Sequence, residues 1–276
     1  MSSLALTAQA RSGKRCGGGA AARLLAFVLF ALVFGCLPCC FAAEEDTAVD
    51  SLALELRGQA PAVKRPAGEV QAVYDRVVAA LAERAAAEMP QGSSPNAMAL
   101  QEICFHASRP GAGRERAAVC KAMLPLLDAK TPEEVRLWVL RQLERIGRGE
   151  CVAAVAALLD DTQPPIRERA LRVLQTVPDA SAAEALRAAL ERAAEPGSRA
   201  GLMLALGYRR DAGSVLLLEK ALAAADALAA ADALAAVGTK KAGAALLAAK
   251  VPEEAGAVLD DARARCAAAL TASGER

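Results

Sequence analysis

Few residues of this sequence have the types and spacing that catalysis requires. His106 is the single histidine of the 276 residues. No G-x-S-x-G motif accompanies it, so the sequence does not indicate a serine nucleophile activated by histidine. We interpret His106 as a partly buried helix residue beside a loop, because histidine is commonly found at intermediate burial.

Four cysteines lie beyond the N-terminal segment, and no two of them have C-x-x-C spacing. A zinc site is therefore not expected, and we predict no bound metal. In an oxidising compartment a disulfide between Cys104 and Cys120 is a candidate, since they lie on the two helices of one predicted pair. The alternative is four buried free thiols, at Cys104, Cys120, Cys151 and Cys266.

The composition favours close helix packing over ligand or nucleic-acid binding. Hydrophobic residues make up 54% of the chain but aromatic residues only 3%, and we expect Trp138 to be a packing residue. The first 42 residues hold four of the 33 basic residues and no acid, which leaves 29 basic against 32 acidic residues. A mildly acidic chain lacks the basic surface that nucleic acids require. We predict no cofactor, no catalytic residue and no enzymatic activity.

A repeated motif positions these residues. When Arg136 is aligned with Arg167, 31 residues later, apolar residues coincide four, seven and ten positions beyond each arginine, which is one helical stripe. A third copy begins at Arg199, and a fourth has Ala227 in place of the arginine. The stripe residues are Leu140, Leu143 and Ile146, then Leu171, Leu174 and Val177, then Met203 and Leu206, then Ala231, Leu234 and Val237.

Helix-breaking residues support the same register. Gly147, Pro178 and Gly238 each lie eleven positions after the anchor, whereas the third copy has Gly207 at eight. Each unit is therefore a helix, a turn and a second helix in about 31 residues, as in known helical repeats. One pair cannot bury its apolar stripe alone, so neighbouring pairs must stack into a solenoid.

Capping boxes are predicted at the starts of two of these helices. Thr131 and Glu134 have the spacing of such a box at a first helix, and Ser181 and Glu184 have it at a second helix. In this motif the hydroxyl accepts from a free backbone N–H and the glutamate reaches back to the residue that caps the helix.

The run Leu158-Leu159-Asp160-Asp161, followed by Pro165-Ile166-Arg167 and Ala170-Leu171, resembles HEAT-like repeats of the short, phycobilisome-lyase type. The resemblance covers residues 96–270 and suggests an exported bacterial protein. It implies an all-α fold, an α-solenoid of stacked antiparallel helix pairs, and a role as an interaction scaffold.

The resemblance also suggests roles for repeated polar residues. Arg136, Arg167 and Arg199 resemble a structural ladder in which arginines hydrogen-bond neighbouring turns; a ladder that faces acidic ligands is the alternative. The second helices of such solenoids usually line the concave face. The candidate partner surface on these helices has mixed charge and comprises Arg187, Glu191, Arg192, Glu219 and Lys220. The alternative is that these side chains are merely solvated and bind no partner.

Residues 1–43 have the pattern of an export signal. A basic, glycine-rich start precedes an apolar run, and small residues end at Ala42 before three acids. We favour cleavage after Ala42. Residues 24–43 are also long enough to span a bilayer, so a retained membrane anchor is an alternative, and lipid attachment at Cys36 is another. The protein is accordingly predicted to be periplasmic or secreted, or anchored to the membrane by this segment.

The remaining boundaries follow from composition and periodicity. Residues 44–68 are predicted to be a flexible linker, 69–95 a capping helix and loop, 96–270 the repeat array, and 271–276 a frayed tail. We expect a scaffold or adaptor of the cell envelope with an unidentified protein partner. A catalytic accessory such as a chromophore lyase-like subunit and a membrane-tethered spacer are the alternatives.

Overall fold

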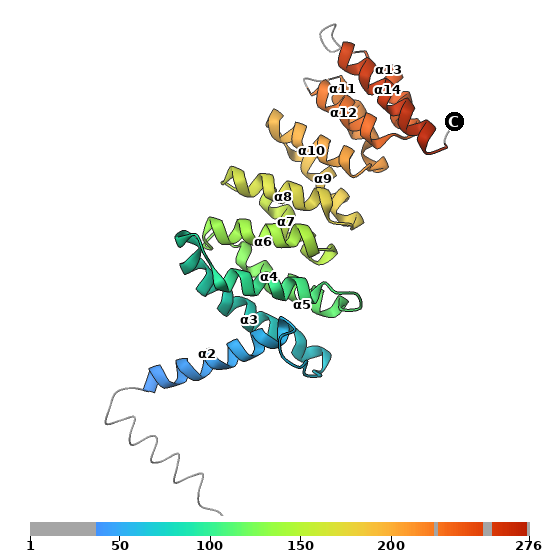
Figure 1. Ribbon diagram of the computed structural model, residues 1–276. Coiled ribbons are helices and arrows are strands. Elements are labelled where there is room, and N and C mark those ends of the chain that lie inside the picture. Colours follow the sequence, from blue (N-terminus) through green and yellow to red (C-terminus); the bar gives the residue numbers. More distant parts are fainter. Residues whose placement is uncertain (1–36, 224–225, 251–255, 275–276) are drawn as a thin grey trace, which may run out of the picture. The chain divides into compact units, whose positions relative to one another are not determined.

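The computed structural model describes residues 37–223, 226–250 and 256–274 (Figure 1). In these ranges the chain forms thirteen α-helices and four short 3-10 helices, without any strand. The chain divides into two units, residues 1–48 and 49–276, and α3 to α14 all belong to the second. The α-helices are α2 (Leu37–Leu56), α3 (Ala67–Glu88), α4 (Pro95–Ala107), α5 (Gly113–Met123), α6 (Glu133–Ile146), α7 (Gly149–Ala157), α8 (Pro164–Thr176), α9 (Ala180–Arg192), α10 (Pro196–Tyr208), α11 (Val215–Leu222), α12 (Ala227–Val237), α13 (Lys240–Ala248) and α14 (Gly256–Ala272). The 3-10 helices are η1 (Met89–Gln91), η2 (Leu124–Leu127), η3 (Leu158–Asp160) and η4 (Ala212–Ser214).

Within the second unit, successive helix pairs stack on one another. Helices α6, α8, α10, α12 and α14 contact each other in this order, and α5, α7 and α9 form a second row beside them, as do α11 and α13 (Figure 1). Buried apolar residues continue from one pair to the next as a single core. This arrangement is the predicted α-solenoid, in which each pair buries its apolar stripe against its neighbours.

The predicted apolar stripe is largely buried. Leu143, Leu174, Leu206 and Leu234, each seven positions after its anchor, are all 0% exposed. Leu171 is the exception, since it is only partly buried and lies beside a surface groove. The prediction that Trp138 is a packing residue is confirmed by its burial.

Both predicted capping boxes are wrong. Helix α6 begins after Pro132, which has an extended backbone and provides no side-chain cap, so Thr131 is one residue too early. Helix α9 is capped by Asp179, whose carboxylate accepts a hydrogen bond of 3.0 Å from the Ser181 N–H. Ser181 therefore lies inside the first turn. An aspartate at the N-cap satisfies a free N–H at least as well as serine, so the helix begins earlier.

The linker predicted over residues 44–68 differs from the structure in its first half. Helix α2 continues to Leu56, and Val49, Ala53 and Leu56 are buried on one face. Residues 57–66, here called the strap, form no helix and join α2 to α3. Helix α3 corresponds to the predicted capping helix and packs against α4 and α5.

The two ends of the chain leave part of the prediction untested. Residues 1–36 of the predicted leader lie outside the described residues, and residues 37–43 form the first turns of α2. No described helix is both long enough and apolar enough to cross a membrane. At the other end α14 continues to Ala272, two residues into the tail predicted over residues 271–276.

Small residues bring α10 and α12 into close contact. A Cβ atom added at Gly207 would lie 2.7 Å from the Cα atom of Ala233, and backbone cannot move aside as a side chain can. Gly201, on the same helix, differs because an added Cβ would lie 3.2 Å from the flexible end of Leu171. Gly207 is thus required by packing, whereas Gly201 tolerates a methyl group.

Gly207→Ala should destabilise the fold by about 1–3 kcal/mol, because the added methyl group overpacks the α10–α12 contact. The matched variant Gly201→Ala should be neutral or gain up to about 1 kcal/mol from helix propensity. Urea unfolding followed by circular dichroism measures both. Equal effects of the two substitutions would contradict the close approach of α10 and α12.

Candidate functional site

A groove between α8 and α10 contains two of the arginines singled out from the sequence. It has a volume of about 560 Å³ and is called here the α8–α10 groove. Both Arg167 and Arg192 line it. Its other lining residues are Leu159, Asp160, Pro164, Glu168, Leu171, Ala189, Ala193, Ala194, Glu195, Gly197, Ser198, Gly201 and Leu202.

The groove exists because the first turns of α10 carry small side chains. Gly197, Ser198 and Gly201 line it, so little side-chain volume fills the space beside α8. The partly buried Leu171 and the buried Leu202 contribute apolar surface. Charged residues of both signs also line this groove. An apolar surface with polar groups of both signs around it suits a polypeptide ligand better than a single small ion.

The predicted arginine ladder is built into the ends of neighbouring helices. Arg136 is 3% exposed and donates from Nε to the carbonyl of Leu127 over 3.1 Å. It also donates from Nη1 to Gln163 Oε1 over 2.9 Å and forms an ion pair with Asp161. The hydrogen bond from Arg136 lowers the pKa of Asp161 below its usual range. Arg136 therefore joins the end of one helix pair to the start of the next.

The other two arginines of the ladder repeat only part of this arrangement. Arg199 donates to the Ala193 carbonyl over 3.1 Å and pairs with Asp226 at 2.6 Å. Arg167 donates to the Asp161 carbonyl over 2.8 Å, but no acidic side chain pairs with it in the described part of the chain. Arg167 is thus the ladder member that lines the groove.

The predicted partner surface is not one continuous patch. Arg187 pairs with Asp211 at 2.6 Å in a separate recess, while Arg192 lines the α8–α10 groove. The exposed Glu191 follows Arg187 by one turn, and the exposed Glu219 and Lys220 lie on α11. Among these five residues Arg192 is the one that lines the same groove as Arg167 of the ladder.

The candidate disulfide is absent, since Cys104 and Cys120 are both free and buried, as are Cys151 and Cys266. Cys104 Sγ lies 4.0 Å from Met123 Sδ, whereas Cys120 Sγ faces the carbonyl oxygen of Ile146 at 3.7 Å. The two thiols thus point to different neighbours. Burial raises the pKa of Cys104 to about 12 and that of Cys151 to about 11. It also raises the pKa of Cys120 and Cys266.

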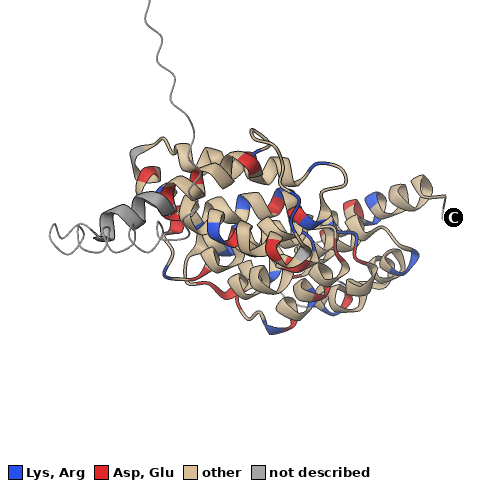
Figure 2. Cartoon of the chain, turned by 90° about the horizontal axis from the view of Figure 1, so that it is seen from below, with Lys and Arg blue, Asp and Glu red and all other residues tan. Residues whose placement is uncertain are grey.

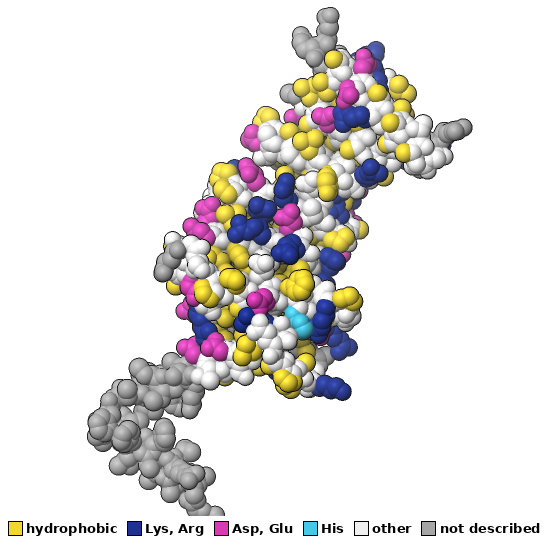
Figure 3. All heavy atoms as spheres, viewed as in Figure 1, with side chains coloured by type: hydrophobic (Ala, Val, Ile, Leu, Met, Phe, Trp, Pro, Cys, Tyr) yellow, Lys and Arg dark blue, Asp and Glu magenta, His cyan; other side chains and the backbone are white. Residues whose placement is uncertain are grey.

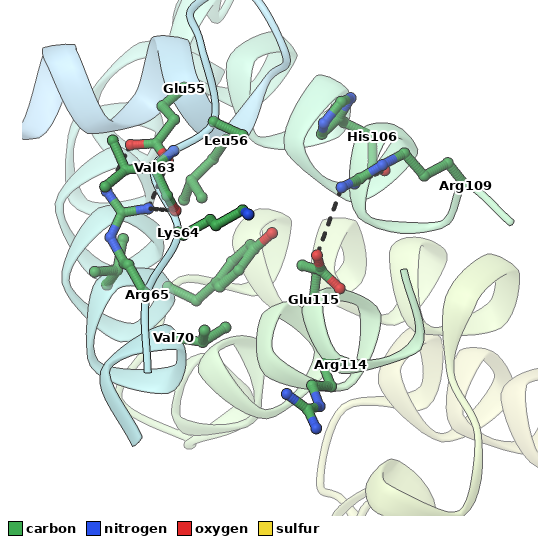
Figure 4. A pocket seen from close by; sticks show the side chains of 13 residues that line it. Glu55, Leu56, Val63, Lys64, Arg65, Val70, His106, Arg109, Arg114 and Glu115 are labelled. Carbon is green, nitrogen blue, oxygen red and sulfur yellow. Dashed lines mark hydrogen bonds and ion pairs between the residues drawn. The ribbon is translucent and has the colours of Figure 1, made fainter. Parts of the chain in front are cut away.

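His106 lies partly buried on α4, as predicted, but it belongs to a second recess. This strap cavity has a volume of about 430 Å³ and lies between the strap, α3, α4 and α5 (Figure 4). Burial lowers the pKa of His106. Tyr74 of α3, which no motif of the sequence singles out, also lines the cavity. Among the described residues no group of three or more His, Cys, Asp or Glu side chains is placed to hold a metal ion.

The surface charge of the described helices is mixed. Basic and acidic residues are interspersed along them in Figure 2, and in the face drawn in Figure 3 hydrophobic side chains lie among both kinds. Neither view shows a face of one sign.

Comparison with known proteins supports the repeat assignment. A family model described as HEAT repeats matches residues 120–206, which include all of α6 to α9 and the arginine ladder. No curated protein matches the chain. The chain is therefore HEAT-like in this region, and HEAT repeats in general suggest a scaffold for protein interaction.

Arg136→Ala should lower the free energy of unfolding by about 3–5 kcal/mol, because it leaves Asp161 and the Leu127 carbonyl without their buried donor. Arg172→Ala, at an exposed position of α8, should have little effect. Chemical unfolding of both variants makes the comparison. Similar stability of the two variants would show that the ladder is not structural.

The Arg136–Asp161 pair should also make stability depend on pH. Because the folded-state pKa of Asp161 is lowered, its contribution is complete above its unfolded pKa of about 3.9 and is lost as pH falls through the folded value. The wild type should thus be more stable than Asp161→Asn at pH 6, and this difference should shrink below about pH 4. The other carboxylates titrate in both proteins, so their contributions cancel in this difference in stability. A difference that stays constant with pH would contradict the assignment.

Proposed function

We propose that this protein is a non-catalytic scaffold or adaptor that binds a protein partner at the α8–α10 groove. The observation that carries the proposal is this groove, which lies inside the region that matches HEAT repeats. It is an open recess lined by apolar residues and by charged residues of both signs. Clefts between helices are a common place for a partner to insert an apolar side chain.

The lining of the groove supports a peptide segment as the occupant. Leu171 and Leu202 offer apolar contact, and a volume of about 560 Å³ holds a few side chains of a partner. Arg167 and Arg192 supply donors for acidic side chains of that partner, while Glu168 and Glu195 would oppose further acids. Arginine at such a site recognises carboxylates through two parallel hydrogen bonds, which fix the orientation of the carboxylate.

The cysteines favour a scaffold over a chromophore lyase-like accessory. A nucleophilic cysteine needs an accessible thiolate, which requires a lowered pKa. Here the thiols of Cys104, Cys120 and Cys151 are buried and burial raises their pKa. These three thiols are therefore poorly suited to attach a chromophore.

The place of action that we propose is the cell envelope. The basis is the sequence of residues 1–43, which has the pattern of an export signal or membrane anchor. A protein exported in this way would carry its repeats into the periplasm or the medium, or hold them at the membrane. The mass of the mature protein distinguishes cleavage after Ala42 from retention of the segment.

Ser198→Trp should abolish partner binding, because the indole would occupy the α8–α10 groove at an exposed position of the first turn of α10. Ala244→Trp, exposed on α13, is the matched control and should bind as the wild type does. The measurement is recovery of envelope proteins on immobilised wild type and on each variant. The proposal fails if no protein is retained specifically, or if both tryptophan variants retain it equally.

A further inference from the structure

The outer face of α4 carries large apolar side chains that remain open to solvent. Met98 is 63% exposed and Phe105 is 78% exposed. They lie seven residues apart, which is close to two helical turns, so both side chains lie on the same face of α4. The exposed Gln101 lies between them. Exposed apolar residues that share one face of a helix indicate an interaction surface.

Helix α6, the neighbour of α4 in the stack (Figure 1), continues this apolar surface. Leu137 and Trp138 line a hollow of about 520 Å³ together with Met98, although Trp138 is only 8% exposed and presents no more than an edge. In the next copy of the repeat the same two positions hold the charged Glu168 and Arg169. The repeat therefore does not require apolar residues at this surface, which is called here the α4–α6 face.

Two opposite charges flank the hollow on α6. Glu134 and Arg141 both line it and both are exposed. Neither side chain forms an ion pair or a hydrogen bond with another residue that the structure describes. They lie seven residues apart, about 10 Å along the helix, with Leu137 and Trp138 midway between them. Along α6 the face therefore runs from a negative charge through an apolar centre to a positive charge.

This order of charges is complementary to itself. If two copies of α6 pack antiparallel about a two-fold axis, Glu134 of each copy lies opposite Arg141 of the other, and the apolar residues meet at the axis. A two-fold interface requires such a self-complementary surface. Parallel packing would instead place like charges opposite each other, which opposes association. The charge pattern therefore favours the antiparallel pairing.

We propose that the α4–α6 face binds a second copy of this chain, with the two α6 helices antiparallel. Burial of Met98 and Leu137 drives this association, and two Glu134–Arg141 pairs, one on each side of the axis, fix its register. The α4–α6 face shares no lining residue with the α8–α10 groove, so the inference does not depend on the scaffold function.

Sedimentation equilibrium of the full chain tests this dimer. The mass of the wild type should approach twice that of one chain as the protein concentration rises to about 100 µM, the range of weak complexes. Glu134→Arg and Arg141→Glu should each weaken association at least about fivefold, because each places like charges opposite each other. An equimolar mixture of these two variants should associate as the wild type does, since both pairs of the mixed dimer again have opposite signs.

The matched control is Arg172→Glu, because Arg172 is exposed and has in α8 the position that Arg141 has in α6. This variant should associate as the wild type does, and so should Ser198→Trp, which fills the other groove. Circular dichroism checks the fold of each variant, and a folding defect would not be reversed by mixing.

Three results would overturn the proposal. The first is a wild type that stays monomeric over the whole concentration range. The second is association that neither Glu134→Arg nor Arg141→Glu weakens, as expected if residues 1–43 caused it. The third is a mixture of the two variants that associates no more tightly than either variant alone.

Discussion

The carbonyl groups at helix ends are the constraint on which the stacking depends. The last four carbonyls of a helix have no partner inside it, and in a solenoid these ends lie against the next helix pair. Arginines of neighbouring helices satisfy them: Arg136 reaches Leu127, Arg199 reaches Ala193, and Arg209 reaches the end of α8. Each such hydrogen bond links adjacent helix pairs. The burial of apolar side chains and the hydrogen bonding of the helix-end carbonyls therefore favour the same stacking geometry.

The two recesses occur where this regular pattern changes. At the α8–α10 groove Arg167 lacks the acidic partner that Arg136 and Arg199 have, and glycines at 197 and 201 leave space beside α8. At the strap cavity a non-helical segment, rather than another helix, covers α3 and α4. Departures from the repeat therefore create both recesses.

Local patterns predicted the helices well and their side-chain partners poorly. The spacing of Leu143, Leu174 and Leu206 depends only on the period of the helix, so it identified the buried face before any contact was known. The pairing of Cys104 and Cys120 depended on the rotation of two helices about their axes, and a fraction of a turn directs the thiols to different neighbours. The buried face of α2 was missed because its short apolar pattern lies among acids.

The sequence by itself determined the all-helical class, the period of about 31 residues and the register of the stacked pairs, because these follow from short-range spacing of apolar and helix-breaking residues. Only the tertiary structure decided which carbonyl each arginine satisfies and which residues share a recess. Tyr74 and Lys64 line the same cavity as His106, although each lies more than 30 residues from it in the sequence. Which residues share this cavity depends on how the strap packs against the helices, and the local spacing of residues in the sequence does not specify that packing.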